Sequence, residues 1–313
     1  MTDSNRTTHV VSLAPVAGSR FQPTGFPDLG AATFQRPTQS GWVEALLVES
    51  VQSMANRLEA TTWDDANQGP VPAVQQLPYV QVVDPDGVVL TSSRVEAHRL
   101  ASAYIMEGTI ETDDRNVEVA KWLPTLLGLA KGRPLDHHTF VRTVFDLDPL
   151  SLVHGVFFAQ KSWPWQPKVS RAVTCFIEAH EVRPAVSGGV KKDSVVNTVA
   201  AGDTVRGYGM VPHQRTEYTA REVVAFITID HGQIRAYGLS QARTELLEAL
   251  IDFEVSTLFS TSLRLRTACD LDVVSAEPPL PDVDAATARL TLAIAAVSSE
   301  LQPVRTVVSG RSS

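Results

Sequence analysis

The chain has 313 residues, of which 43% are hydrophobic, and its formal net charge is −8. This length and hydrophobic content allow a buried core in one elaborated domain or in two smaller ones, and they exclude a disordered chain. No apolar run approaches the roughly 18 residues that span a bilayer, and the N-terminal sequence MTDSNRTTHV has no apolar signal core. We therefore expect a cytoplasmic protein with no membrane partner.

The charge is unevenly distributed along the chain. Between Lys161 and Glu222 there are nine basic and six acidic residues, so this region carries +3 and the remainder carries −11. An acidic surface disfavours binding of phosphate over the whole protein. It does not exclude a local basic groove, because salt screens charges that are more than roughly 8 Å apart.

The N-terminal region predicts a strand, a loop and a helix. His9 to Val16 is a short β-branched run, and a loop rich in Gly, Pro and aromatic residues follows it. A helix is predicted from about Gly41 to Ala60, because apolar residues recur there at steps of three and four, which places them on one face. These residues are Val43, Leu47, Val51, Met54 and Leu58.

The opposite face of this predicted helix carries unusual side chains for a solvated surface. It presents Glu49, Gln52, Ser53 and Asn56, with Arg57 at its edge. Amides and a guanidinium can recognise a ligand, whereas ordinary solvent exposure is the simpler interpretation.

The middle of the chain predicts a hairpin and then broken helices. Leu77 to Thr91 contains the turn sequence DPDG between two short apolar runs, and Ser92 or Ser93 is placed to cap a helix through Met106. The segment from Asn116 to Gly155 has helical character, but prolines and glycines interrupt it. We interpret residues of about 61–165 as a helical insertion.

The C-terminal half completes an alternating pattern. Strands are predicted at Val169–Val182, Val223–Asp230 and Leu263–Val274, and helices at Ser240–Ser260 and Asp284–Glu300. Without the insertions, the order is strand, helix, strand, strand, helix, strand. This order is typical of an α+β, ferredoxin-like or RRM-like antiparallel sheet with its helices on one face.

A long polar, Gly-rich segment, about 184–221, separates two of these strands. It lacks the spacing of a phosphate-binding P-loop. It does gather cations near Tyr208 and Met210, a combination that suits sequence-independent binding of single strands, although a solvated surface loop is an equally good interpretation. The cations are Lys191, Lys192, Arg206, His213 and Arg215.

Catalytic and metal-binding patterns are weak. Cys175 and Cys269 have no zinc or disulfide spacing, His137 and His138 fit a helix start, and His154 and His180 fit hydrogen-bonded core positions. No catalytic motif such as GxSxG or HExxH occurs. We expect neither a metal nor a cofactor.

Seven stretches, in order along the chain, resemble one family. They are GSRFQPTGFPDLG, LVESVQSMANRLE, LVHGVF, SGGVKKD, YGMVPHQRTEYTA, IRAYGL and LRLRTACDL. Together they resemble the RAMP-superfamily backbone subunits of CRISPR Cascade surveillance complexes, specifically those of type I-G, formerly I-U.

The resemblance implies a single elaborated RRM-like domain over residues 1–313, with the 184–221 insertion as a thumb-like hairpin. It implies a non-catalytic subunit that assembles head to tail along guide crRNA and presents bases to target DNA in antiviral defence. The implied partners are other copies, other Cascade subunits and a recruited helicase-nuclease. RNA contacts are implied for Arg20, Gln52, Asn56 and Arg57 and for the five cations of the long segment, with Lys191 and Lys192 in the thumb.

Two other functions remain open from the residues alone. A metal-dependent nuclease of the same superfamily would cut its bound strand with Asp193 or Asp203. A protein-only module would pack its Gln52 and Asn56 face on a partner helix. For an RNA-binding helix, Glu49 is discordant beside phosphate, so we expect it to face a neighbouring subunit or to pair with an arginine.

Overall fold

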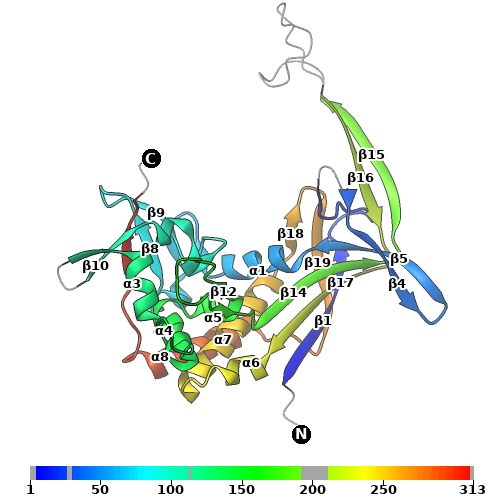
Figure 1. The fold of residues 1–313 in the computed structure, drawn as a ribbon. Coiled ribbons are helices and arrows are strands. Elements are labelled where there is room, and N and C mark those ends of the chain that lie inside the picture. The colour runs from blue at the N-terminus through cyan, green and yellow to red at the C-terminus, as the bar shows by residue number, and fades with distance from the viewer. Residues whose placement is uncertain (1–4, 27–29, 113–114, 192–210, 311–313) are drawn as a thin grey trace, which may run out of the picture.

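The computed structural model describes residues 5–26, 30–112, 115–191 and 211–310. It contains a seven-stranded sheet and a five-stranded sheet with helices packed between and around them (Figure 1). The predicted α+β class is confirmed. No helix within the described residues is long and apolar enough to cross a membrane.

The seven-stranded sheet has the order β18-β19-β1-β17-β14-β5-β4, and all neighbouring strands are antiparallel. In β1, His9, Val11 and Leu13 are buried and Val10 between them is exposed, as expected for a strand with one covered face. The strand bounds are β1 Arg6–Pro15, β4 Thr33–Thr38, β5 Gly41–Glu49, β14 Val173–His180, β17 Glu222–Asp230, β18 Leu263–Arg266 and β19 Cys269–Glu277.

The predicted helix from Gly41 to Ala60 is wrong in its first half. Gly41–Glu49 is strand β5, and helix α1 spans Val51–Ala60. Pairing with β4 on one side and β14 on the other satisfies the backbone of β5, which a local apolar period cannot foresee. The helix begins where Ser50 accepts a hydrogen bond from the backbone N–H of Ser53 at 3.2 Å.

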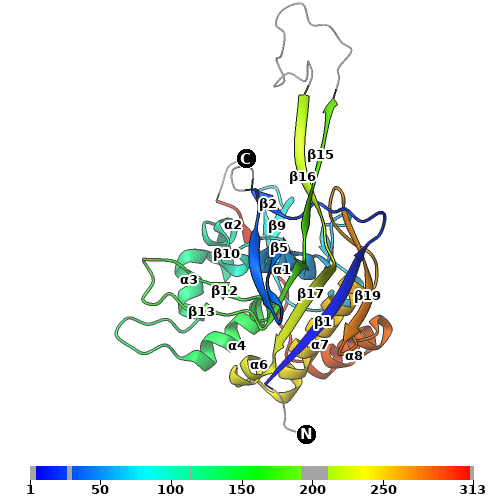
Figure 2. The ribbon, with the colours of Figure 1, turned by 90° about the vertical axis from the view of Figure 1, so that its right-hand side faces the viewer.

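Helices cover one face of this sheet. Figure 2 shows β1 and β17 in front of α7 and α8. The predicted helices near the C-terminus are confirmed as α7, Gln241–Phe259, and α8, Val283–Val297, and α6 spans His231–Ala236. The strand predicted at Leu263–Val274 is instead the hairpin of β18 and β19.

The five-stranded sheet was not predicted. Its order is β11-β10-β20-β8-β9, and its central strand comes from the C-terminal end and runs parallel to β8. The predicted DPDG hairpin is confirmed, since Asp84 accepts hydrogen bonds from the backbone of Asp86 and Val88. The bounds are β8 Val80–Val83, β9 Val89–Ser92, β10 Thr109–Thr112, β11 Arg115–Glu118 and β20 Arg305–Val308.

The insertion at 61–165 contains strands as well as helices. The single helix predicted from Ser92 to Met106 is wrong, because Arg99 has a φ of 50° and only a 3₁₀ turn, η2, and a short helix, α2, form. The broken helices predicted after residue 116 are confirmed. The elements are η1 Pro72–Val74, η2 Arg99–Ala101, α2 Ala103–Met106, α3 Val119–Leu126, α4 His137–Leu147 and α5 Leu150–His154.

A hairpin, β15 Arg183–Lys191 with β16 Val211–Thr219, projects from the main sheet (Figure 1). Its base is tied to the loop after β1 by a bridge between Tyr218 and Phe21. The shorter strand pairs are β2 Gly25–Phe26 with β3 Gly30–Ala31, β6 Trp63–Asp64 with β7 Gly69–Pro70, and β12 Val156–Phe157 with β13 Lys168–Val169.

Candidate nucleic-acid interface

Helix α1 presents two of the predicted contact residues to solvent. Met54, Ala55 and Leu58 are buried, whereas Gln52 and Asn56 are exposed. Gln52 and Asn56 are four residues apart, so their side chains project from successive turns of the same face. This amide face is therefore free to meet a ligand.

A groove of about 690 Å³ lies beside Gln52. Three segments that are distant in the sequence line it: the turn that leads into η2, the junction of α5 with β12, and the stretch from β13 into β14. The lining residues are Gln52, Ala97, His98, Arg99, Ala101, His154, Gly155, Val156, Phe157, Ala159, Gln160, Lys168, Val169, Ser170, Arg171 and Thr174.

The groove combines cations with an exposed aromatic ring. Phe157 is 51% exposed and pairs across the short β12–β13 ladder with Lys168, which is also exposed. Arg171 is half-buried, and its Nε has no hydrogen-bond partner among the described residues. Ammonium and guanidinium groups that meet phosphates, together with a ring that stacks on bases, are the elements of single-strand binding.

Arg171 would be stabilised by an anion. Burial lowers the pKa of its guanidinium, the neighbouring Arg99 lowers it further, and Glu59 partly offsets both effects. A desolvated cation beside a second cation is unfavourable until a negative charge approaches it. The groove thus offers an electrostatic site for a phosphate.

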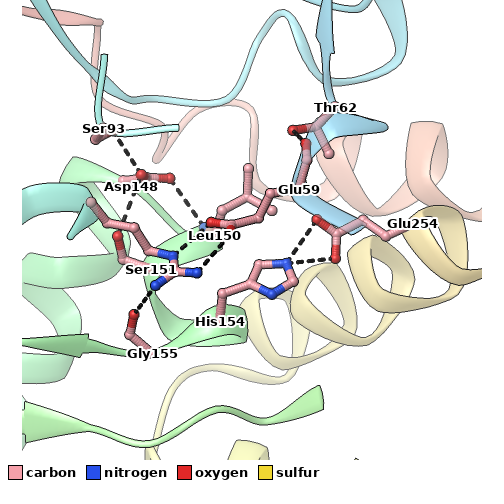
Figure 3. Close-up of polar contacts among 10 residues, drawn as sticks. Glu59, Thr62, Ser93, Asp148, Leu150, Ser151, His154, Gly155 and Glu254 are labelled. Carbon is pink, nitrogen blue, oxygen red and sulfur yellow. Dashed lines mark hydrogen bonds and ion pairs between the residues drawn. The ribbon is translucent and has the colours of Figure 1, made fainter. Parts of the chain in front are cut away.

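A buried ion pair between Arg99 and Glu59 lies at the groove, and Figure 3 shows Glu59 and Gly155, the two partners of Arg99. Arg99 donates to both carboxylate oxygens of Glu59, on α1, at 2.6 Å, and to the backbone oxygen of Gly155 at 3.0 Å. This bidentate geometry fixes the turn at η2 relative to both α1 and the end of α5. Arg99 therefore positions the lining of the groove.

Two further buried contacts hold α5 in place (Figure 3). His154 Nε2 lies 2.9 Å from Glu254 Oε2 on α7, and Asp148 accepts hydrogen bonds from Ser93 Oγ at 2.7 Å and from the backbone of Leu150 at 3.1 Å. His154 was expected to be a hydrogen-bonded core histidine, and this is confirmed.

Arg20 lies at a different hollow, of about 380 Å³, next to the base of the projecting hairpin. Its guanidinium is 3.3 Å from the buried carboxylate of Glu217 on β16. This hollow and the groove share no lining residue. Arg20 and Gln52, which the sequence analysis grouped together, are therefore at separate places on the molecule.

Arg57 and Glu49 form a link within the chain. Glu49, the last residue of β5, is 2% exposed and pairs with Arg266 and, at 3.9 Å, with Arg57. Arg57 also donates to the backbone oxygens of Arg264, at 3.2 Å, and Leu265. The expected pairing of Glu49 with arginine is confirmed. The RNA contact of Arg57 stays a prediction, made by a side chain that already ties α1 to β18.

The remaining predicted contacts lie on or beyond the hairpin. Lys191 is the last residue of β15, and His213 and Arg215 lie on β16, where their backbones pair with Gly189 and Ser187. Lys192, Arg206, Asp193 and Asp203 lie outside the described residues. The predicted contacts are thus divided among the α1 face, the Arg20 hollow and the hairpin.

No metal site emerges from the described residues, where no group of three or more His, Cys, Asp or Glu is placed to hold an ion. Cys175 and Cys269 are confirmed as buried core residues with free thiols. Burial raises the pKa of Cys269 to about 11, so its thiol is protonated at neutral pH.

Comparison with known families adds an independent observation. Residues 9–184 match the model of a family described as "CRISPR-associated protein GSU0053 (Cas_GSU0053)", which is more than half of the chain. The chain belongs to this CRISPR-associated family. The predicted relationship to CRISPR-associated proteins is therefore confirmed. No curated protein matches the sequence.

Among solved structures, this CRISPR-associated protein is similar to "Crystal structure of Thermofilum pendens Csc2", with 9% identity, a TM-score of 0.33, and coverage of 98% of this chain and 79% of that one. It is also similar to a chain of "CRISPR RNA-guided surveillance complex, pre-nicking", with 12% identity, a TM-score of 0.38, and coverage of 85% and 76%. At these values neither similarity bears on function.

Most of the groove of this CRISPR-associated protein was not predicted from the sequence. Phe157, Lys168 and Arg171 were not selected. Two signals pointed toward them: Phe157 ends the LVHGVF stretch, and Lys168 and Arg171 fall inside the segment with excess positive charge. Neither signal indicated that these residues meet α1.

Proposed function

We propose that this protein is a non-catalytic backbone subunit of a type I-G Cascade complex and that it holds guide crRNA by its sugar-phosphate backbone. The observation that carries the proposal is the groove beside α1, where cations, an exposed aromatic ring and amides converge in a member of a CRISPR-associated family. A ferredoxin-like, RRM-like core is part of this proposal. It is supported by the spatial strand order β19-β1-β17-β14. Along the chain, α1 lies between β1 and β14, and α7 lies between β17 and β19.

The chemistry of the groove suits a guide of any sequence. Lys168 and Arg171 are placed to meet phosphate oxygens, Gln52 can bond to 2′-hydroxyls, and the face of Phe157 can stack on any base. Such contacts hold the strand without reading it. The Watson–Crick edges then remain available for target DNA.

The proposal extends to the assembly. Copies of the chain bind head to tail along the guide, the β15–β16 hairpin acts as the thumb between successive copies, and other Cascade subunits complete the complex. Cleavage of the target is carried out by a recruited helicase-nuclease.

The test is binding of a fluorescent single-stranded RNA, measured by anisotropy at several salt concentrations. The double variant Lys168→Ala/Arg171→Ala should bind more weakly, and its logarithmic salt slope should shrink by about 1.4, because each lost phosphate contact removes about 0.7 for a single strand. The control is Lys131→Ala/Arg133→Ala, which removes two exposed cations that lie outside the groove.

A folded Lys168→Ala/Arg171→Ala variant, verified by circular dichroism, with an unchanged salt slope would overturn the groove as the RNA site. Labelled RNA and single-stranded DNA incubated with the wild type and Mg²⁺ should stay intact. Cleavage that Asp203→Ala abolishes would instead identify a nuclease.

A further inference from the structure

The projecting hairpin joins the main sheet through a short neck, residues 181–182 and 220–221. The ladder between β14 and β17 ends at the pair of His180 and Glu222. The ladder between β15 and β16 begins at the pair of Arg183 and Thr219. The neck lies between these ladders, where the same two strands leave the sheet and run into the hairpin (Figure 1). The direction of the hairpin is therefore set at the neck.

One residue of the neck has a strained backbone. Glu181 has a φ of 52°, a left-handed conformation that a residue other than glycine keeps only when its surroundings hold it. Val182 donates its backbone N–H to the backbone oxygen of Glu44 at 3.1 Å. The Arg221 N–H donates to the backbone oxygen of His180, also at 3.1 Å. The ion pair of Glu181 with Arg221, at 3.3 Å, is exposed and contributes little.

His180 lies between two carboxylates at the start of the neck. It is 2% exposed. Its Nε2 is 3.2 Å from Glu178 Oε2, on its own strand, and its Nδ1 is 3.5 Å from Glu222 Oε2 on β17. The ring also lies against Phe226 of β17, with centroids 6.4 Å apart, and the residue that pairs with His180 on β5 is the uncharged Ala45. The charges that face the imidazole from β14 and β17 are thus both negative.

This arrangement suits a protonated histidine. A neutral imidazole has one N–H and one lone pair, so it donates to one carboxylate and turns a lone pair toward the other. An imidazolium has two N–H groups and donates to both carboxylates, and hydrogen bonds between charged groups are the stronger kind. Protonation of His180 therefore connects β14 to β17 at the last pair before the neck.

We propose that protonation of His180 controls how firmly the hairpin is held against the main sheet. The imidazolium ties β14 to β17 and so keeps Glu181 in its strained conformation. When the proton is lost, one ring nitrogen faces a carboxylate without an N–H, the neck opens more often, and the hairpin changes direction relative to the sheet. Histidine changes its charge between about pH 5 and pH 8, so the hairpin is held most firmly at the acidic end of this range. This switch acts on the hairpin whether or not the groove holds RNA.

Hydrogen exchange followed by mass spectrometry measures the opening of the neck. The reporters are the backbone N–H groups of Val182 and Arg221, whose hydrogen bonds close the neck. The observed rates are corrected for the intrinsic effect of pH on exchange. Protection of both groups should then fall about tenfold between about pH 5 and pH 8, which corresponds to the loss of one charge-assisted hydrogen bond.

Three variants identify the group that titrates. His180→Gln cannot gain a charge, so its neck protection should stay at the low value of the wild type at high pH. Glu222→Gln changes a side chain that is 57% exposed, which the fold tolerates, and should reduce the pH-dependent change. The matched control is His231→Gln on α6, which removes another histidine–glutamate contact, of 3.1 Å with Glu248, and should follow the wild type.

Pulsed electron spin resonance tests the movement of the hairpin. Spin labels are attached through Val186→Cys on β15 and Val274→Cys on β19, where the native side chains are 75% and 65% exposed. The distance distribution should be narrow near pH 5 and broad near pH 8 in the wild-type background, and broad at both values with His180→Gln. Neck protection and label distances that do not change with pH, or that change equally in the His180→Gln protein, would overturn the proposal.

Discussion

Gly155 shows how one residue shapes the groove. It ends α5 with φ 82° and ψ 153°, a conformation that is essentially restricted to glycine. A Cβ at this position would lie 2.8 Å from the backbone oxygen of Val169 and 3.1 Å from the backbone nitrogen of Arg171. The absence of a side chain thus permits the close approach that places Arg171 in the groove.

We predict that Gly155→Ala lowers the free energy of unfolding by about 3 kcal/mol, since strain of about 1–3 kcal/mol adds to the clash. Gly132→Ala is the matched control. Gly132 also has a positive φ, of 76°, but no atom of the described residues lies within 4 Å of its Cβ position. Its cost should be about 1 kcal/mol, from strain alone. Urea denaturation measures both values, and equal losses for the two variants would show that the close approach contributes nothing.

The buried carboxylate of Glu49 illustrates why side-chain identity alone misleads. In the helix predicted from Gly41 to Ala60, Glu49 would lie on the polar face with Gln52 and Asn56. At the end of β5 it is instead enclosed by Arg266 and Arg57. An ionised carboxylate can be buried there because two guanidinium groups replace its hydration. Glu49 therefore organises the base of α1 and does not approach the groove.

At the scale of elements, the contact of His154 with Glu254 joins α5 to α7. Burial of the imidazole opposes its protonation, but the charges of Glu254 and Glu59 and the hydrogen bond to Glu254 outweigh burial and raise the pKa of His154. Arg99, the nearby cation, acts in the opposite direction. The net effect is a buried histidine that is easier to protonate in the folded state than in the unfolded state.

This contact predicts a pH dependence of stability. Because folding raises the pKa of His154, protonation of this histidine stabilises the folded state. This stabilisation is fully present below the unfolded-state pKa of about 6.5 and is lost as pH rises through the folded-state pKa. The free energy of unfolding should therefore fall with rising pH in this window, and His154→Gln should lack that component. Urea unfolding at a series of pH values measures it. His138→Gln, at an exposed position at the start of α4, should follow the wild type, and parallel curves for wild type and His154→Gln would contradict the prediction.

At the scale of the whole molecule, the groove differs in charge from the chain as a whole. The chain carries −8 in total, yet the cations Lys168 and Arg171 line the groove. An acidic exterior reduces adherence to stray nucleic acid, while the groove provides a local positive field. In the proposed function, affinity for a long RNA depends on repeated, identical contacts along the strand.

We predict that RNA length controls assembly. As single-stranded RNA is lengthened, the mass of the complex should rise in steps of one 34.0 kDa chain, measured by light scattering coupled to size exclusion. Each added copy binds where its neighbour holds it close to the strand, which raises its effective concentration. High salt should reverse the steps. A single copy per RNA at every length would contradict the head-to-tail arrangement.

The sequence by itself determined features that depend on neighbours along the chain. The DPDG turn and helices α7 and α8 were predictable because turn chemistry, capping and apolar period act within a few residues. The exposed amide face of α1 was also predictable from the sequence, since Gln52 and Asn56 are four residues apart and therefore lie on one face of any helix that contains them. The family stretches supplied the CRISPR association that the match over residues 9–184 confirms.

Only the tertiary structure decided where chemistry converges. The same apolar pattern became strand at 41–49 and helix at 51–60, because β4 and β14 were available to pair with the first part. The groove unites Gln52, His98 and the 157–171 region, and a smaller pocket unites Asn56 with Trp63 and Arg94. Contacts between distant segments depend on the packing of the whole core, and spacing along the chain does not encode them locally.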